Sequence, residues 1–266
     1  LFGTGILGVR AACAVFAGLG LLCALLVTRR FARGLGWPLL FALLFAACAF
    51  PRHKLFESAL ASMAAWFAVR LLERPTLARH LGAGVFVGLA GTFGSNLGLY
   101  AGLGTAAVLA LVAWKERAPG RLRRAGAWAV GVVLGFAPFL AMLAFVPGFA
   151  GGVRDSIALI LEHGANIAKP WPWPWRVPSA SALPLRDWTE SLAFLLPVLS
   201  LPPLLVVALR TRAEDLPARA ACLAPALVAP FFLHHASVNS GAWHLAQCVQ
   251  PLLLALLWSA GGWLRL

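Results

Sequence analysis

Long apolar runs constrain this chain more than any other feature of its sequence. Several are long enough, at about 17 to 25 residues, to cross roughly 30 Å of hydrocarbon as helices, and short Arg-rich or Trp/Pro-rich segments separate them. Of the 266 residues, 61% are hydrophobic and only 12% are charged, whereas charged residues make up about a quarter of a typical soluble domain. The sequence therefore predicts an all-α protein, a polytopic transmembrane helix bundle, and excludes a soluble domain.

The apolar runs predict about eight or nine membrane segments, some of them short or broken. The expected spans are 11–28, 37–50, 56–72, 81–93, 97–114, 125–146, 191–209, 219–233 and 247–264. They form a single transmembrane domain over residues 1–266. The chain starts at Leu1 and enters an apolar run with no charged segment or cleavage site before it, so we expect a fragment that lacks the N-terminal part of a longer protein.

The formal charge of +13 is better explained by membrane topology than by nucleic acid, because the cations lie at the ends of apolar runs and form no single basic face. Fifteen of the 22 cations fall in connections that would share one side of the membrane. The positive-inside rule places these fifteen in the cytoplasm and the 147–190 and 234–246 segments outside, in a multi-pass protein of the plasma membrane. The fifteen are Arg29, Arg30, Arg33, Arg70, Arg74, Arg79, Lys115, Arg117, Arg121, Arg123, Arg124, Arg210, Arg212, Arg219 and Arg265.

A polar break at residues 94–96 divides a glycine-rich apolar stretch, 81–114, that is too long for one straight span. Two short helices meeting at the break are expected. The spacing Gly84-xxx-Gly88 lets helix backbones approach closely, which is how small residues promote packing in lipid. The other interpretation is a broken helix that lines a substrate path, as in transporters.

Two cations lie on the side that the positive-inside rule disfavours. Arg52 and Lys54 flank His53 just before the 56–72 span, and Glu57 follows one turn later. A function that needs positive charge there, such as holding a lipid-linked phosphate, would explain them. The alternative is that both side chains snorkel at the interface and Lys54 pairs with Glu57.

Three histidines and an asparagine are concentrated in the outer 234–246 segment. His234, His235 and His244 are joined there by Asn239. Their spacing does not match a dedicated metal site, and no cofactor is identified, although imidazoles can bind a divalent metal. Hydrogen bonding to a polar substrate or phosphate, or an ordinary interfacial role, are the interpretations that stay open.

The 147–190 segment is expected to be a long outer loop rich in tryptophan and proline. It opens with a stretch that holds Arg154 and Asp155, and it contains Trp171-Pro-Trp-Pro-Trp175. Proline at every second residue excludes an α-helix and favours extended, polyproline-like chain. The indole faces suit either the lipid interface or the apolar face of a sugar ring.

These features together resemble the C-type superfamily of integral-membrane glycosyltransferases, which includes the protein mannosyltransferases and aminoarabinose transferases. The resembling stretches are Pro51-Arg52-His53-Lys54, then residues 83–90 leading into Gly98-Leu99-Tyr100, and finally His244-Leu245 followed by Pro251. The similarity covers most of the chain and concerns the order and composition of these stretches, with no single diagnostic motif.

The resemblance implies sugar transfer from a polyprenyl-phosphate donor on the outer face of the membrane. Its partners would be a lipid-linked sugar and membrane lipids, with no nucleic acid. Arg52 and Lys54 match the expected phosphate-binding cations, and Arg154, His235, His244 and Asn239 are further substrate-binding candidates. The family's general base is an acid in the first large outer loop, so we expect it upstream of Leu1.

A transporter or flippase of a lipid-linked or anionic solute is the alternative function, with the broken 81–114 stretch as its site. We find no internal repeat and no carboxylate in the middle of a span, which disfavours it. A polymerase or ligase of surface polysaccharide shares the outer-loop chemistry and is not separated from the transferase by sequence.

Overall fold

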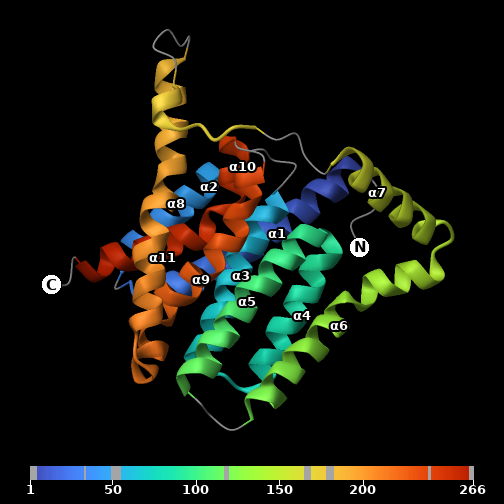
Figure 1. Ribbon diagram of the computed structural model, residues 1–266, viewed down its shortest axis with the longest axis horizontal. Helices are drawn as coiled ribbons and strands as arrows, with labels where there is room; N and C mark the ends of the chain where they lie inside the picture. Colours follow the sequence, from blue (N-terminus) through green and yellow to red (C-terminus); the bar gives the residue numbers. More distant parts are fainter. Residues whose placement is uncertain are drawn as a thin grey trace.

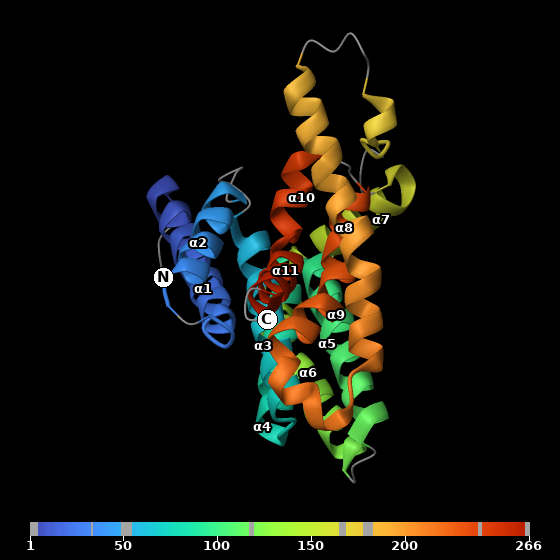
Figure 2. The same ribbon diagram turned by 90° about the vertical axis from the view of Figure 1, so that its left-hand side faces the viewer.

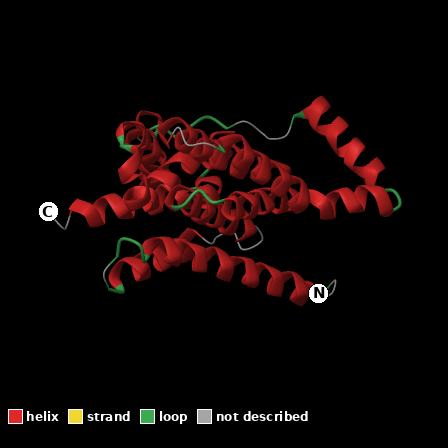
Figure 3. Ribbon diagram, turned by 90° about the horizontal axis from the view of Figure 1, so that it is seen from below, coloured by secondary structure: helices red, strands yellow, loops and turns green. Residues whose placement is uncertain are grey.

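The computed structural model describes residues 5–32, 34–48, 55–116, 120–164, 169–177, 183–238 and 241–263. Helices make up 88% of the structure, and the described residues contain no strand (Figure 3). The prediction of an all-α fold is confirmed. The helices are α1 (Ile6–Thr28), α2 (Gly36–Cys48), α3 (Leu55–Glu73), α4 (Leu77–Phe93), α5 (Ser95–Glu116), α6 (Arg121–Phe145), α7 (Phe149–His163), the 3₁₀ turn η2 (Pro174–Arg176), α8 (Pro184–Arg210), the 3₁₀ turn η3 (Ala213–Asp215), α9 (Leu216–Val238), α10 (Ala242–Cys248) and α11 (Gln250–Trp263).

Five helical segments are long and apolar enough to cross a membrane. They are α1, α5, α6, α8 and the stretch 213–237, which includes α9 up to Ser237, while α2, α4 and most of α11 are apolar but shorter. Much of the surface of α1, α6 and α8 is apolar and exposed, with Leu122, Val133 and Leu199 each more than half accessible. Exposed apolar surface on this scale fits contact with lipid.

Helices α3 and α9 form the centre of the bundle, with α1, α5, α8 and α11 packed around them (Figure 2). One reason is the small side chains of α3, since Ala61, Ala64, Ala65 and Ala68 are completely buried. Small residues allow helices to approach on several sides where bulky ones would hold them apart.

Helices α4 and α6 meet along a seam of four glycines. A Cβ added at Gly84 or Gly88 would overlap backbone atoms of α6, and one added at Gly131 or Gly135 would overlap backbone atoms of α4. The close packing expected from the Gly84-xxx-Gly88 spacing is confirmed. Its partner is a second glycine pair of the same spacing, which the sequence interpretation did not single out.

The polar break at 94–96 is the turn of a helical hairpin. Gly94 ends α4 and Ser95 begins α5, as expected for two helices meeting there. A Cβ at Gly98 would overlap the backbone of Gly91, so the two helices touch directly beside the turn. The break thus lies at the ends of both helices and does not interrupt either of them.

The basic segments meet at one end of the bundle, which we call the basic end. Glu73 at the end of α3 pairs with Arg30, which follows α1, and lies 3.8 Å from Arg79 in α4. Arg124 pairs with Glu116 at 3.2 Å, so the end of α5 and the start of α6 lie there too. The Lys115 ammonium donates to the Leu209 carbonyl oxygen at 2.6 Å, which brings the end of α8 to the same place.

The expected 147–190 loop is a loop only in part. Residues 149–163 form α7, so Arg154 and its glycine neighbours are helical, and α8 already begins at Pro184. No residue of α7 is buried, and the helix leaves the bundle beyond the end of α6 (Figure 1). Its apolar and charged residues separate onto two faces, a pattern that gives a surface helix without requiring a core.

The Trp/Pro segment itself is extended only at its start. Trp173 has the dihedral angles of polyproline II, and Pro174–Arg176 then turns as a 3₁₀ helix. Its three indoles stack in sequence, with centroids 5.1 Å apart from Trp171 to Trp173 and 5.0 Å apart from Trp173 to Trp175.

Candidate functional site

A buried carboxylate and a buried imidazole meet at the end of the bundle opposite the basic end. Glu57 lies in the first turn of α3, and one of its oxygens is 3.6 Å from Nε2 of His235 in the last turn of α9. Only 9% of the Glu57 side chain and 14% of the His235 side chain are exposed. Such a pair can hold or pass a proton, and burial strengthens the interaction between its members.

Two further side chains complete this group. Gln247 on α10 lies within hydrogen-bonding distance of His235, with its Oε1 atom 3.1 Å from Nε2. The rings of His235 and His244 are 5.1 Å apart between centroids. We call Glu57, His235, His244 and Gln247 the histidine cluster.

Tyr100 connects the third histidine to this group. Its hydroxyl lies 3.3 Å from Nδ1 of His234, and its ring packs edge-on against His234 and His235. Tyr100 lies in the second turn of α5, close to the residue where the helix begins. The α4–α5 turn therefore lies beside the histidines, at the end of the bundle.

The short helix α10 holds His244 and Gln247 in place. A carboxylate oxygen of Glu190 on α8 accepts a hydrogen bond from the Ala242 backbone N–H at 2.8 Å, which caps the N-terminus of α10. Cys248, at the other end of α10, has a buried thiol. This thiol donates to the His244 carbonyl oxygen at 3.0 Å.

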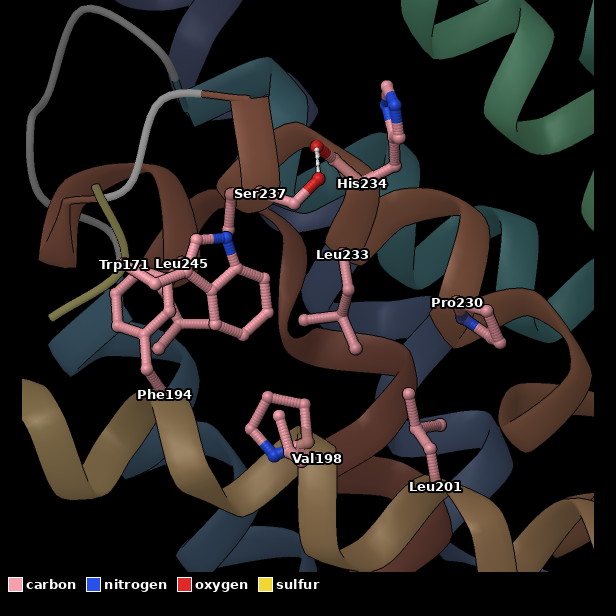
Figure 4. Close-up of a pocket in the computed structure, with 11 residues that line it drawn as sticks. Trp171, Phe194, Val198, Leu201, Pro230, Leu233, His234, Ser237 and Leu245 are labelled. Carbon is pink, nitrogen blue, oxygen red and sulfur yellow. Dashed lines mark hydrogen bonds between the residues drawn. The ribbon is translucent and has the colours of Figure 1, made fainter. Parts of the chain in front are cut away.

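An apolar pocket of about 270 Å³ opens beside the histidines, between α8 and α9 (Figure 4). Phe194, Val198 and Leu201 line it from α8, and Trp171 covers it from the Trp/Pro segment. The Trp171 ring packs edge-on against Phe194, with centroids 5.6 Å apart. His234 belongs to the rim, and its ring points away from the apolar centre.

The structure brings together some of the predicted site residues and separates others. His235 and His244 lie together, as their crowding in the sequence suggested. Arg154 lies on α7, its side chain is 82% exposed, and it pairs with Asp155 at 3.1 Å, so it takes no part in the histidine cluster. Arg52, Lys54 and Asn239 lie outside the described residues.

Sequence reasoning missed two members of the histidine cluster, Glu57 and Gln247, and the neighbouring Tyr100. Glu57 stood out one turn after the basic tripeptide, but its partner was expected to be Lys54, and the contact with His235 joins helices far apart in the chain. Among residues that the structure describes, no three or more His, Cys, Asp or Glu side chains are arranged to hold a metal ion.

Comparison with known proteins identified no relative of this chain. No protein-family model matches the chain, and neither a curated protein nor a solved structure matches it. The fold defines a helical protein with several helices suited to a membrane, and the histidine cluster with the pocket beside it is the feature that bears on its function.

Proposed function

We propose that this protein is a membrane glycosyltransferase that takes a sugar from a polyprenyl-phosphate donor. One observation carries the proposal: the buried Glu57–His235 pair lies at the same end of the bundle as an apolar pocket whose rim includes His234. A polyprenyl-phosphate sugar has a polar reacting head and an apolar tail. A cluster of acid–base groups next to an apolar pocket suits such a substrate.

In this proposal each part of the donor meets a different part of the site. The isoprenoid units next to the phosphate lie in the pocket between α8 and α9. Arg52 and Lys54 precede Glu57 by five and three residues, and their charges stabilise the phosphate as it leaves. The Glu57–His235 pair takes the proton of the acceptor hydroxyl as the new glycosidic bond forms.

Assigning the proton transfer to Glu57 replaces an expectation from the sequence. The family resemblance predicts the general base upstream of Leu1, in the first large outer loop. The contact between Glu57 and His235 supports a different choice, since an adjacent imidazole can share the proton that the carboxylate accepts. The proposal otherwise keeps the predicted setting: eight or nine membrane segments, the plasma membrane, the basic end in the cytoplasm and transfer on the outer face.

The transporter alternative receives less support from the fold. Its site was the break at 94–96, which is a hairpin turn beside the histidines, with α4 and α5 touching directly next to it. A carrier of this kind would need an interrupted helix partway across the membrane.

Removing the two cations before α3 tests the proposal. The double variant Arg52→Gln/Lys54→Gln should lose transfer from a radiolabelled polyprenyl-phosphate sugar, because two charges that offset the leaving phosphate are gone. Membrane insertion and yield should not change. The matched control is Arg10→Gln/Arg186→Gln, which removes two exposed arginines near the starts of α1 and α8, on the same predicted side.

The assay separates the two functions when the same proteoliposomes are examined for movement of the labelled lipid across the bilayer. Transfer that depends on Arg52 and Lys54, without such movement, supports the transferase. Movement of the lipid with no sugar transferred would overturn the proposal and favour the flippase.

A further inference from the structure

The basic end holds a second pocket, far from the histidine cluster. Its volume is about 360 Å³, and it lies where α8 ends and α9 begins. Figure 1 shows this connection at the same end of the bundle as the last turn of α5 and the first turn of α6. Three arginines and one acid contribute to its lining, namely Arg210, Arg212, Arg219 and Asp215.

Positive charge exceeds negative charge in this pocket. Arg212 lies 3.7 Å from Glu214, in an ion pair whose side chains are both largely exposed. The side chains of Arg210 and Arg219 form no hydrogen bond or ion pair with the residues that the structure describes. Two arginines from different helices therefore line one cavity, and a guanidinium group can bind phosphate oxygens through two parallel hydrogen bonds.

The remaining wall of the pocket is apolar and continues along α8. Val206 and Val207 line the pocket, and both remain more than two fifths exposed. Leu199 and Leu209 on the same helix are more than half exposed. Since α8 is one of the helices suited to span a membrane, this surface can carry hydrocarbon chains that begin next to the arginines.

We propose that this pocket binds the phosphate headgroup of an anionic phospholipid, with the acyl chains along α8. Arg210 and Arg219 hold the phosphate, and Val206 and Val207 contact the first part of the chains. A free phosphate ion would use the arginines but leave the apolar wall without a role, which favours the lipid. The site lies at the end of the bundle opposite the proposed transfer site and does not depend on it.

Native mass spectrometry of the purified protein tests this. The protein is incubated with equal amounts of phosphatidylglycerol and phosphatidylcholine of the same acyl chains, and the retained lipid is counted. The wild type should retain phosphatidylglycerol preferentially. Arg210→Gln/Arg219→Gln should retain about tenfold less, because both phosphate-binding groups are lost. Arg210→Lys/Arg219→Lys should fall between the two, since it keeps the charge but loses the paired geometry.

The control is Arg74→Gln/Arg123→Gln, which removes two exposed arginines from the basic end that do not line this pocket. It should retain lipid as the wild type does, and size-exclusion profiles establish that each variant is folded. Equal loss in the control, or no loss in Arg210→Gln/Arg219→Gln, would overturn the proposal. Displacement of the lipid by glycerol 3-phosphate at an equal concentration would assign the site to a free phosphate.

Discussion

Glu57 on α3 and His235 on α9 lie 3.6 Å apart, between a carboxylate oxygen and Nε2. Glu57 belongs to the first turn of α3, and His235 belongs to the last turn of α9. The contact therefore fixes how the two central helices of the bundle align along their length. The same contact that aligns the helices supplies the proposed acid–base pair.

Replacement of Glu57 by Gln tests the chemical part of this contact. Glutamine keeps the shape and can bond to His235 but cannot accept a proton, so transfer should fall by about 10²- to 10⁴-fold. Glu162→Gln, in the exposed helix α7, is the matched control and should be as active as the wild type. A Glu57→Gln protein that transfers sugar at the wild-type rate would show that the base lies elsewhere.

Filling the apolar pocket should weaken donor binding without altering the chemistry. Leu201→Trp places a large ring where the first isoprenoid units are proposed to lie, so KM for a long-tailed donor should rise about tenfold, with kcat little changed. Leu199→Trp adds the same ring to an exposed face of α8 and should leave KM as it is. If both variants behave alike, the tail does not bind in this pocket.

The glycine seam between α4 and α6 should not tolerate a side chain. Gly88→Leu would place atoms inside the backbone of α6, and we expect the protein to lose about 3 kcal/mol of stability or to fail to accumulate. Gly126→Leu on α6 meets open space and should cost about 1 kcal/mol or less. Thermal unfolding in detergent measures the difference, and equal Tm values for the two variants would contradict the packing.

The basic end and the Trp/Pro segment are predicted to lie on opposite sides of the membrane, which cysteine labelling can test. In a background without the five native cysteines, single cysteines at 173 and 239 should react with an impermeant reagent on intact cells. Cysteines at 117 and 212 should react only after the membrane is opened, because the positive-inside rule retains the basic end in the cytoplasm. The reverse pattern would invert the orientation.

Much of the helical fold could be predicted because it depends on local composition. Most predicted spans fall on one helix each, since apolar runs are bounded by residues that end helices, such as Pro75 before α4 and Gly120 before α6. The span predicted at 247–264 is an exception, because it takes in the end of α10 as well as α11. Gly120 has a φ of +83°, a conformation that glycine adopts without strain. The start of α7 at Phe149 was missed because the two adjacent glycines, Gly151 and Gly152, resemble a loop.

The site could be predicted only where its members are close in sequence. His235 and His244 belong to one short segment of the sequence and were recognised together. Glu57, Tyr100 and Glu190 come close to that segment only through contacts between helices. Such contacts depend on how α3, α5, α8 and α9 align, and apolar periodicity carries no information about that alignment. Gly131 and Gly135 were missed for the same reason, because a glycine pair identifies a close approach but not its partner.

The seam between α4 and α6 also bears on how the chain enters the membrane. Helix α4 has 17 residues and begins with Arg79 and His80 in its first turn, so it inserts less readily than its longer neighbours. During synthesis its glycine face has no matching surface until α6 has been made, with all of α5 between them. Helix α4 can therefore complete this packing only after α6 has been made. Arrested nascent chains ending after Glu116 should be extracted by alkali more easily than chains ending after Phe145.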